Sequence, residues 1–424
     1  MSNFVEKYVK GFLKKHALLR KKARVLNTYV KKKWYISISK KHNIDNHKVL
    51  FETFMGRQYG CNPRAIYEYM ISDDRFKNYK FVWAFENPDD KKSFTELERA
   101  ETVKYKSKDY YRAYASAKYI ITNSNIDYHI VKKKGQVFMQ TWHGTPLKKL
   151  RCDIEAEYGN VNNTLDEIKM KNALDVVRYD YFLSPSRFAS EKFKSAFNLR
   201  QLKKENIIVE TGYPRNDLMF NYTDVEIEKI LNELGIKTDK KILLYAPTYR
   251  DNQHESGKGY VYNLYLDFDR MYKEIGDQYI ILFRAHYFIA NQFDFEKYKG
   301  FVYNVSDLDD ITKLYLITDV LVTDYSSVFF DYANLKRPMI FYMYDLDEYE
   351  REIRGFYIDL NELPGPIVKS ENELIESIKS INSEFLHNEK YDKFNKKYNY
   401  LDDGEASKRV SELITGNRSD TDEI

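Results

Sequence analysis

The segment QYIILFRAH, residues 278–286, decides the fold class of this 424-residue chain. It is a nearly unbroken apolar run of strand length that ends in an arginine and a histidine. Such a run is typical of a strand buried on both faces, as parallel strands covered by helices are. Nine further runs share this character: KVLFETF (48–54), KFVWAF (80–85), AKYIIT (117–122), QVFMQTW (136–142), YDYFLS (179–184), NIIVETG (206–212), KILLYAP (241–247), DVLVTD (319–324) and RPMIFYM (337–343).

Longer polar segments with helical spacing separate these runs, for example PRAIYEYMISD at 63–73 and DEIKMKNALDVV at 166–177. This alternation predicts an α/β fold with parallel sheets. The length of the chain favours two domains over one. We expect about five strands in the first sheet and four or five in the second. The predicted boundaries are a basic N-terminal segment at 1–46, two α/β domains at 47–212 and 213–390, and a closing helix with a tail at 391–424.

Cysteine usage and hydropathy indicate where the protein works. The two cysteines, Cys61 and Cys152, are too few for a disulfide framework, which fits a reducing compartment. The N-terminus carries a charge every few residues and has no apolar signal-peptide core. No stretch approaches the roughly 20 apolar residues that span a bilayer. We therefore expect a cytoplasmic protein, either soluble or peripheral on a membrane.

The net charge is only +4, but the basic residues concentrate near the N-terminus. Apolar pairs recur there every three to four positions between lysines and arginines, and Trp34 and Tyr35 follow directly. This pattern predicts a basic amphipathic helix lying on an anionic membrane surface, with the aromatic rings at headgroup depth. The alternative is a solvated helix packed on the body of the protein.

Polar residues follow the carboxyl ends of several predicted strands, the edge of a parallel sheet where ligands bind. After QVFMQTW come His143, Gly144, Thr145 and Pro146. Pro146 suits a first helical position and Thr145 its N-cap, so we expect a helix start that presents free N–H groups. His143 emerges beside it, and its near-neutral ordinary pKa suits a general base. The alternative is a purely structural histidine.

The strand DVLVTD leads into Ser326 and Ser327, one of which we expect to cap the next helix and prepare an anion site. Asp331 follows one helical turn later, where it would accept a hydrogen bond from a ribose or glycerol hydroxyl. The alternative is plain capping with a solvated Asp331.

Arg284 and His286 end another strand, and alternation directs both to one face. Such a pair suits a pyrophosphate, which arginine neutralises and to which histidine donates. Arg215, after NIIVETG, is a further candidate anion clamp, and Thr248 follows a strand end at Pro247.

Several motifs are absent from the sequence. It contains no P-loop and no Gly-x-Gly-x-x-Gly fingerprint, which disfavours an NTPase or a dehydrogenase, and we predict no cofactor. Residues 306–310, SDLDD, resemble a metal-binding Asp-x-Asp, but serine or aspartate before a helix is ordinary capping, so no metal site is predicted. A nucleic-acid-binding scaffold is disfavoured because the basic residues precede the α/β body and no aromatic RNA-binding motif occurs.

At these residues the sequence resembles the CDP-glycerol glycerophosphotransferases of wall teichoic acid synthesis, which include related ribitol-phosphate transferases. The matching segments are QTWHGTPLKKL, ETGYPRND, LLYAPTYRD, ILFRAHY, LVTDYSSVFFDYANLKRPMIFY and RGFYIDLNELPGPIV, in family order. An early segment that usually reads Tyr-Ser-Asp-Asn-Pro is here Tyr59-Gly60-Cys61-Asn62-Pro63, without the acidic residue. The resemblance implies a GT-B architecture, in which a Rossmann-like acceptor domain and a Rossmann-like CDP-donor domain face each other across a cleft.

The resemblance also implies the site. His143 and His286 match the essential histidine pair of the family. The remaining implied contacts to CDP-glycerol are Trp142, Gly144, Thr145, Pro146, Arg215, Pro247, Thr248, Arg284, Ala285, Ser326, Ser327 and Asp331. The implied reaction transfers glycerol phosphate from CDP-glycerol to a hydroxyl of a membrane-anchored, lipid-linked teichoic acid acceptor and releases CMP on the cytoplasmic face. His143 would take the proton of the acceptor, although the division of labour between the two histidines stays open.

Three alternatives remain at this point. The donor would be CDP-ribitol in a ribitolphosphotransferase, because both subfamilies share these motifs. The product would be a capsule in a related polyol-phosphate transferase. A GT-B glycosyltransferase would use a nucleotide sugar instead.

Overall fold

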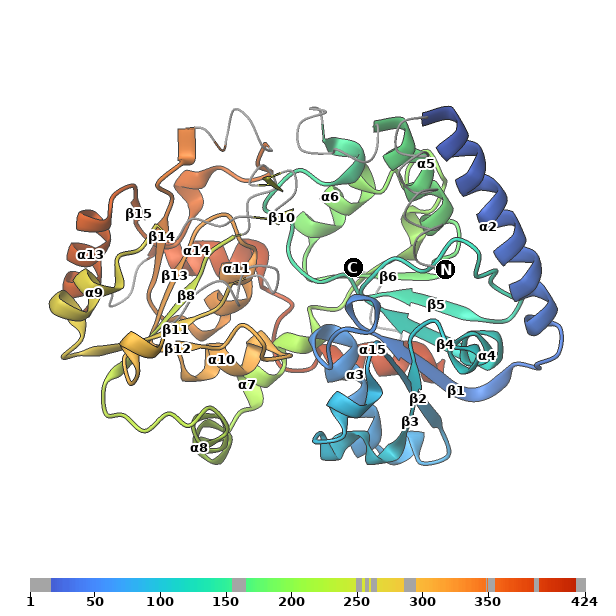
Figure 1. Cartoon of the computed structure of the whole chain (residues 1–424), viewed down its shortest axis with the longest axis horizontal. Coiled ribbons are helices and arrows are strands. Elements are labelled where there is room, and N and C mark those ends of the chain that lie inside the picture. The colour runs from blue at the N-terminus through green and yellow to red at the C-terminus, as the bar shows by residue number, and fades with distance from the viewer. Residues whose placement is uncertain are drawn as a thin grey trace, which may run out of the picture.

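Two parallel β-sheets organise the chain (Figure 1). The computed structural model describes residues 17–154, 165–248, 254–255, 259–260, 265–285, 295–347, 349, 355–384 and 389–416. The first sheet has the strand order β3-β2-β1-β4-β5-β6-β7, and each neighbouring pair is parallel. Its strands are β1 (Asp45–Glu52), β2 (Lys80–Phe85), β3 (Ala100–Lys104), β4 (Ala117–Thr122), β5 (Val137–Gln140), β6 (Tyr181–Ser184) and β7 (Ile208–Glu210).

The second sheet has six parallel strands in the order β12-β11-β8-β13-β14-β15. Its strands are β8 (Lys241–Ala246), β11 (Tyr279–Phe283), β12 (Val302–Asn304), β13 (Val320–Thr323), β14 (Met339–Tyr342) and β15 (Ile367–Val368). A short antiparallel hairpin, β9 (His254–Glu255) with β10 (Gly259–Tyr260), stands apart from both sheets. The predicted α/β fold with two parallel sheets is confirmed.

Each sheet and the helices packed on it form one module. The N-terminal module carries α2 (Ala17–Ser39), α3 (Cys61–Ser72), α4 (Lys108–Ser116), α5 (Leu165–Val176), α6 (Arg187–Ala196) and α15 (Ala406–Thr415). The C-terminal module carries α8 (Asp224–Glu233), α9 (Phe268–Ile275), α10 (Ile311–Ile317), α11 (Val328–Tyr332), α13 (Glu371–Glu384) and α14 (Glu389–Tyr398). The short helix α7 (Leu218–Asn221) lies between them in the sequence.

Strand β1 shows why the apolar runs read as doubly buried. Val49 and Phe51 pack with helix α3 on one face of the sheet, while Leu50 packs with Tyr110 and Tyr114 of α4 on the other. Each of these side chains is fully buried. Burying an aliphatic or aromatic side chain contributes about 1.5–3 kcal/mol, so both faces of the strand favour this position.

The C-terminal segment returns from one module to the other (Figure 1). Helix α14 buries Phe394 and Tyr398 in the core of the C-terminal module. Helix α15, which follows it, buries Val410 and Ile414 in the core beneath α3 of the N-terminal module. The segment expected to form one closing helix therefore forms two, one on each module.

Helix α2 begins at Ala17, the first described residue, and the structure describes side chains from Val25 onward. Tyr35 near its C-terminal end is buried against α4, and the ring of Trp34 lies edge-on 4.8 Å from that of Tyr111. Residues 25–33, which precede them in the helix, are exposed. In the described part of the chain, every helix is too short or too polar to cross a membrane.

Candidate active site

His143 lies on a turn just after β5, at the carboxyl edge of the first sheet. Its Nδ1 atom lies 2.9 Å from the carbonyl oxygen of Asn123, the residue that follows β4. A carbonyl oxygen only accepts hydrogen bonds, so Nδ1 carries the proton and Nε2 keeps its lone pair. The ring is therefore in the tautomer that a general base requires, with Nε2 as the accepting atom.

Loss of hydration among the surrounding protein atoms lowers the pKa of His143 to about 4. The hydrogen bond to the Asn123 carbonyl opposes this shift, while the positive charges of Arg215 and Arg151 add to it. His143 is nevertheless an exposed residue at this edge of the sheet. At neutral pH the imidazole is thus uncharged and can accept a proton from a molecule that reaches it.

Aromatic neighbours restrict the orientation of the His143 ring. The Trp142 ring stacks on it, with centroids 4.3 Å apart, and the Phe54 ring packs edge-on at 5.6 Å. Asn123 also holds this neighbourhood together, because its Oδ1 accepts a hydrogen bond from the backbone N–H of Phe54 at 2.8 Å. The ends of β1, β4 and β5 therefore converge on one imidazole.

The C-terminal module presents a turn of its own at the end of β13. Asp324 lies at its start, and its Oδ1 accepts hydrogen bonds from the backbone N–H groups of Thr248 at 2.7 Å and Tyr325 at 2.6 Å. These two bonds join the end of β8 to the turn that carries Ser326. Asp324 is fully buried, so its task is to shape this edge of the second sheet.

The two modules touch where Gly144 meets Ser327. A Cβ atom at Gly144 would lie 2.6 Å from Ser327 Oγ, closer than real Cβ contacts allow, so a larger residue there would displace the Ser327 hydroxyl. Of the two serines expected to cap α11, Ser326 accepts from the N–H of Val328 at 3.5 Å, whereas the Ser327 side chain caps nothing. The helix is short, with five residues.

The helix start expected at residues 145–146 is wrong. The backbone N–H of Lys149 donates to the carbonyl of Gly355, and that of Tyr357 donates to the carbonyl of Leu147, each at 2.8 Å. These bonds to the C-terminal module engage backbone groups that a helix would use internally. The chain after His143 therefore stays irregular and forms part of the contact between the modules.

A cavity of about 730 Å³ lies between the modules, within the range of small-molecule sites. Among the predicted contacts, Pro247, Thr248, Arg284, Ala285 and Ser326 line it. The loops of the N-terminal module contribute Phe54, Arg57, Gln58, Glu86, Lys91 and Lys148.

Arg284 is held at the cavity by its own neighbours. Its Nη1 donates to the carbonyl of Val305 at 2.9 Å, and the next residue, Ala285, donates its N–H to Ser306 Oγ at 3.0 Å. Loss of hydration lowers the pKa of the guanidinium from its ordinary value. His286 lies outside the described residues, so its position opposite His143 stays a prediction.

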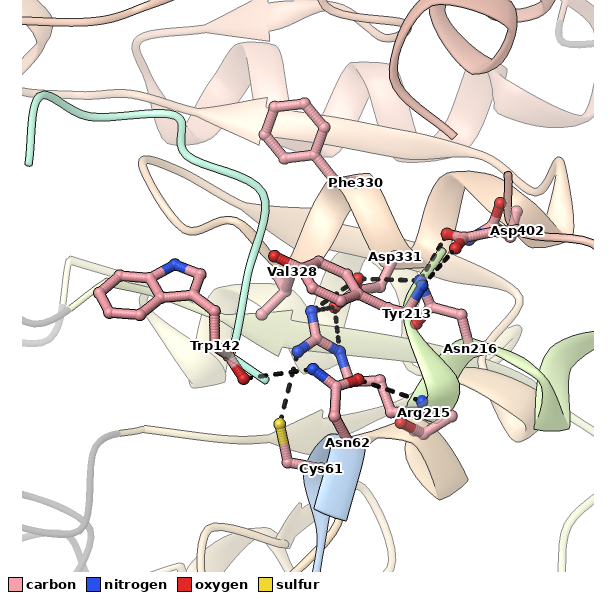
Figure 2. A network of polar contacts seen from close by, with 12 residues as sticks. Cys61, Asn62, Trp142, Tyr213, Arg215, Asn216, Val328, Phe330, Asp331 and Asp402 are labelled. Carbon is pink, nitrogen blue, oxygen red and sulfur yellow. Dashed lines mark hydrogen bonds and ion pairs between the residues drawn. The ribbon is translucent and has the colours of Figure 1, made fainter. Parts of the chain in front are cut away.

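Arg215 and Asp331 were both expected to contact the donor, but in the structure they form an ion pair with each other (Figure 2). Arg215 Nη2 lies 2.9 and 2.8 Å from the two carboxylate oxygens of Asp331, and Nε lies 3.2 Å from one of them. The exposed fraction is 6% for Arg215 and 5% for Asp331, and neither lines the cavity. Trp142, Gly144, Thr145 and Pro146 are likewise buried.

The SDLDD segment is explained by contacts within the protein. Asp310 Oδ1 accepts from the N–H of Thr312, the cap that the sequence indicated. Asp309 pairs with Lys91 of the N-terminal module at 2.6 Å and accepts from the N–H of Tyr59 at 3.2 Å. In the part of the chain that the structure describes, no group of three or more His, Cys, Asp or Glu side chains lies where it would hold a metal ion.

Sequence reasoning missed Asn123, Asp324 and the cavity residues of the N-terminal module. Asn123 could have been predicted, because it directly follows the run AKYIIT and residues after strand ends often bind ligands. Asp324 ends the run DVLVTD, so the apolar pattern includes it in the strand. Arg57 and Lys148 carry no comparable signal, because their approach to the cavity depends on how the two modules face each other.

The fold and site define a two-module α/β protein whose ligand cavity lies between the modules, at the carboxyl edges of parallel strands. Residues 34–416 match the family model described as CDP-Glycerol:Poly(glycerophosphate) glycerophosphotransferase. The chain belongs to this family.

Two curated relatives illustrate the likeness. The chain is 38% identical over 384 residues to a teichoic acid poly(glycerol phosphate) polymerase of Staphylococcus epidermidis, covering 90% of this chain and 52% of that protein. It is 39% identical over 378 residues to a teichoic acid glycerol-phosphate transferase of Staphylococcus aureus, covering 86% and 92%. The chain thus spans about half the length of the polymerase but nearly all of the transferase.

Solved structures show the same architecture. A structure of the wall teichoic acid polymerase TagF matches with a TM-score of 0.83 and 37% identity, covering 96% of this chain and 97% of that one.

A more distant relative, the teichoic acid poly(ribitol-phosphate) polymerase of Bacillus spizizenii, is 32% identical over 377 residues, covering 88% of this chain and 56% of that protein.

Proposed function

We propose that the chain transfers glycerol phosphate from CDP-glycerol to a hydroxyl of a lipid-linked, teichoic-acid-type acceptor and releases CMP. The observation that carries the proposal is the neutral His143, whose Nδ1 is tied to the Asn123 carbonyl, on a turn that touches the far module. The cavity between the modules, lined in part by Arg284 and Ser326, supplies donors for an anionic ligand. Membership of the family supports the same assignment.

In the proposed reaction, Nε2 of His143 accepts the proton of the acceptor hydroxyl while the hydroxyl oxygen attacks the glycerol-side phosphorus. A P–O bond forms to the acceptor, and the bond from that phosphorus to the bridging oxygen breaks. CMP leaves with the bridging oxygen and its electron pair. Arg284 and Ser326 would stabilise the negative charge that develops, and the family resemblance assigns the leaving side to His286.

Glycerol is the favoured polyol of the donor. The relatives whose names specify glycerol phosphate are 38% and 39% identical to this chain, whereas the ribitol-phosphate polymerase is 32% identical. CDP-ribitol is the second candidate donor. A capsule precursor is an alternative acceptor, and a nucleotide sugar an alternative donor.

In a GT-B arrangement, one module would bind the acceptor and the other would bind the donor. In this proposal residues 47–212 hold the acceptor, residues 213–390 hold the CDP group, and residues 391–424 close the structure. The position of Pro247, Thr248, Arg284 and Ser326 on the second sheet supports a donor site on that module.

The experiment that tests the function compares donors directly. The chain is incubated with a synthetic lipid-linked acceptor and CDP-glycerol, CDP-ribitol or a UDP-sugar, and the released nucleotide and the product mass are measured. We expect CMP and a product heavier by whole glycerol phosphate units with CDP-glycerol alone. Preferential use of CDP-ribitol, or release of UDP, would replace the proposed donor.

We also propose that the protein binds peripherally to the inner face of the membrane through α2. Four apolar residues of this helix, Val25, Leu26, Tyr29 and Val30, are each more than half exposed, and Lys31 to Lys33 directly follow them. Exposed apolar side chains next to lysines suit an anionic lipid surface. Met170 and Leu174 of α5 are also about half exposed, and helices α5 and α2 both lie at the upper right of the molecule (Figure 1).

Co-sedimentation with lipid vesicles tests this membrane contact. Replacing Leu26 and Val30 by glutamate removes two inserting side chains, so binding to vesicles with anionic lipid should weaken at least about tenfold. Val225→Glu is the matched control, because Val225 is 73% exposed on α8 of the other module. Equal binding by the double variant and the control would exclude α2 as the contact.

A further inference from the structure

The backbone of Trp142, next to His143, is strained. Its φ angle is +53°, in the left-handed region that a bulky side chain rarely adopts. Such a conformation is unfavourable and persists only where surrounding contacts enforce it. Trp142 is not at an exposed loop tip, since its side chain is 9% exposed. The contacts that enforce this conformation therefore also fix the backbone of the next residue, His143.

Two buried side-chain amides hold the Trp142 backbone from both ends (Figure 2 shows Asn62). The N–H of Trp142 donates to Gln140 Oε1 at 2.9 Å. The carbonyl of Trp142 accepts from Asn62 Nδ2 at 3.2 Å, and the same Nδ2 lies 3.0 Å from the carbonyl of Thr141. Gln140 belongs to the strand that the turn follows, whereas Asn62 reaches the turn from the start of α3.

Asn62 also connects the turn to the opposite module. Its Oδ1 accepts from the backbone N–H of Arg215 at 3.2 Å, and the Arg215 side chain is paired with Asp331 of α11. Helix α11 begins directly after Ser327, the residue that touches Gly144. One buried side chain with no exposed surface thus joins the His143 turn to the ion pair between the modules.

We infer that Asn62 is a positioning residue: its amide holds the strained Trp142 peptide, and so the His143 ring, in register with the Ser326–Ser327 turn of the opposite module. The inference rests on the proposed function only for the role of His143 as base. Asn62 touches no reacting atom in this scheme and acts through Trp142. Arg215 and Asp331 then serve the same alignment and do not bind the donor directly.

The variant Asn62→Asp distinguishes the hydrogen bond that the Asn62 side chain accepts from those that it donates. It keeps an oxygen for the Arg215 N–H but removes the N–H groups that face the carbonyls of Thr141 and Trp142. Gln136→Glu is the matched control, since Gln136 is equally buried and its Nε2 donates to two carbonyls, those of Tyr114 and Ala117, at 2.7 Å each. Gln136 directly precedes β5, whereas the His143 turn follows its far end.

We expect Asn62→Asp to lower kcat for CMP release by about 10- to 100-fold, with the Kd for CDP-glycerol within threefold of that of the unsubstituted chain. Gln136→Glu should keep kcat within about threefold of that of the unsubstituted chain. This holds even if Gln136→Glu lowers the melting temperature as much as Asn62→Asp does. A kcat for Asn62→Asp within threefold of the unsubstituted chain overturns the inference. So does a raised Kd with unchanged kcat, because Asn62 would then be a donor contact.

A second readout does not depend on turnover. In the neutral variant Asn62→Ser, the released turn should change the surroundings of the His143 ring, and its pKa, followed by NMR with His143→Gln assigning the signal, should shift by at least one unit. An unchanged titration overturns the inference even if the variant is well folded. If the unsubstituted chain released no CMP from CDP-glycerol, the proposed function would fail while this titration still decided the role of Asn62.

Discussion

Arg215 shows how a basic residue at a predicted strand end can have a partner other than the expected anion. Its position after β7 made it a candidate anion clamp, and Asp331 was a candidate hydroxyl acceptor. Neither pattern indicates that the two meet, because they lie 116 positions apart and follow strands of different sheets. The approach of the modules decides the pairing, and a single strand-end signal carries no information about it.

Removing the charge of Asp331 should therefore destabilise the protein strongly. Asp331→Asn leaves the guanidinium of Arg215 buried without its carboxylate, which costs about 3–5 kcal/mol for a buried pair. The free energy of unfolding in urea measures this loss. Asp403→Asn is the control, because Asp403 pairs with Arg409 at the surface, where less than about 1 kcal/mol is expected. A loss below 1 kcal/mol for Asp331→Asn would show that the pair is dispensable.

The pKa of His143 should determine how kcat/KM changes with pH on the acidic side. The neutral imidazole is the active base, and its pKa is lowered to about 4, so protonation removes activity only as the pH falls through that value. We expect the acidic limb of kcat/KM to lie near pH 4, well below the ordinary histidine value of about 6.5. The profile is measured with CDP-glycerol and acceptor. An acidic limb centred near pH 6.5 would mean that the base is hydrated, or that it is another group.

At the scale of elements, all ten apolar runs became strands, whereas the hairpin of β9 and β10 and three strands of the sheets, β3, β12 and β15, were missed. These three strands lie at sheet edges. Strand β3 reads AETVK and buries one side chain of five, so it lacks the apolar run that identifies a central strand. The turn after His143 was wrongly predicted as helical, because its pairing with residues 355–357 is a contact between modules that local propensity does not contain.

The contact between the turn at Gly144 and the turn at Ser327 carries the prediction at this scale. Gly144→Ala places a methyl group 2.6 Å from Ser327 Oγ, so the Ser327 hydroxyl must turn away from its position between the two turns. We expect a fall in kcat of about tenfold or more, since small displacements of reacting groups are costly. Gly144→Ala combined with Ser327→Gly removes the opposing hydroxyl and should recover part of the activity. Undiminished kcat in the single variant would show that the two turns do not need to meet.

At the scale of the whole molecule, the class of fold and most of the donor side followed from strand ends. His143, Thr248, Arg284 and Ser326 all lie where parallel strands finish, and that edge is shared by every strand of a sheet. What the sequence lacked was the relative placement of the two sheets. The ion pairs between modules, the cavity and the contact of Gly144 all depend on that placement.

The proposed function requires that the cavity between the modules binds CDP-glycerol and that His143, whose ring contacts the cavity residue Phe54, acts as the base. The most direct measurement is CMP release and product mass for the full chain and for His143→Ala, with a lipid-linked acceptor and CDP-glycerol. We predict CMP release coupled to addition of glycerol phosphate by the unsubstituted chain. In His143→Ala we predict a loss on the order of 100-fold or more, with CDP-glycerol still bound. Near-full transfer by His143→Ala would contradict the account.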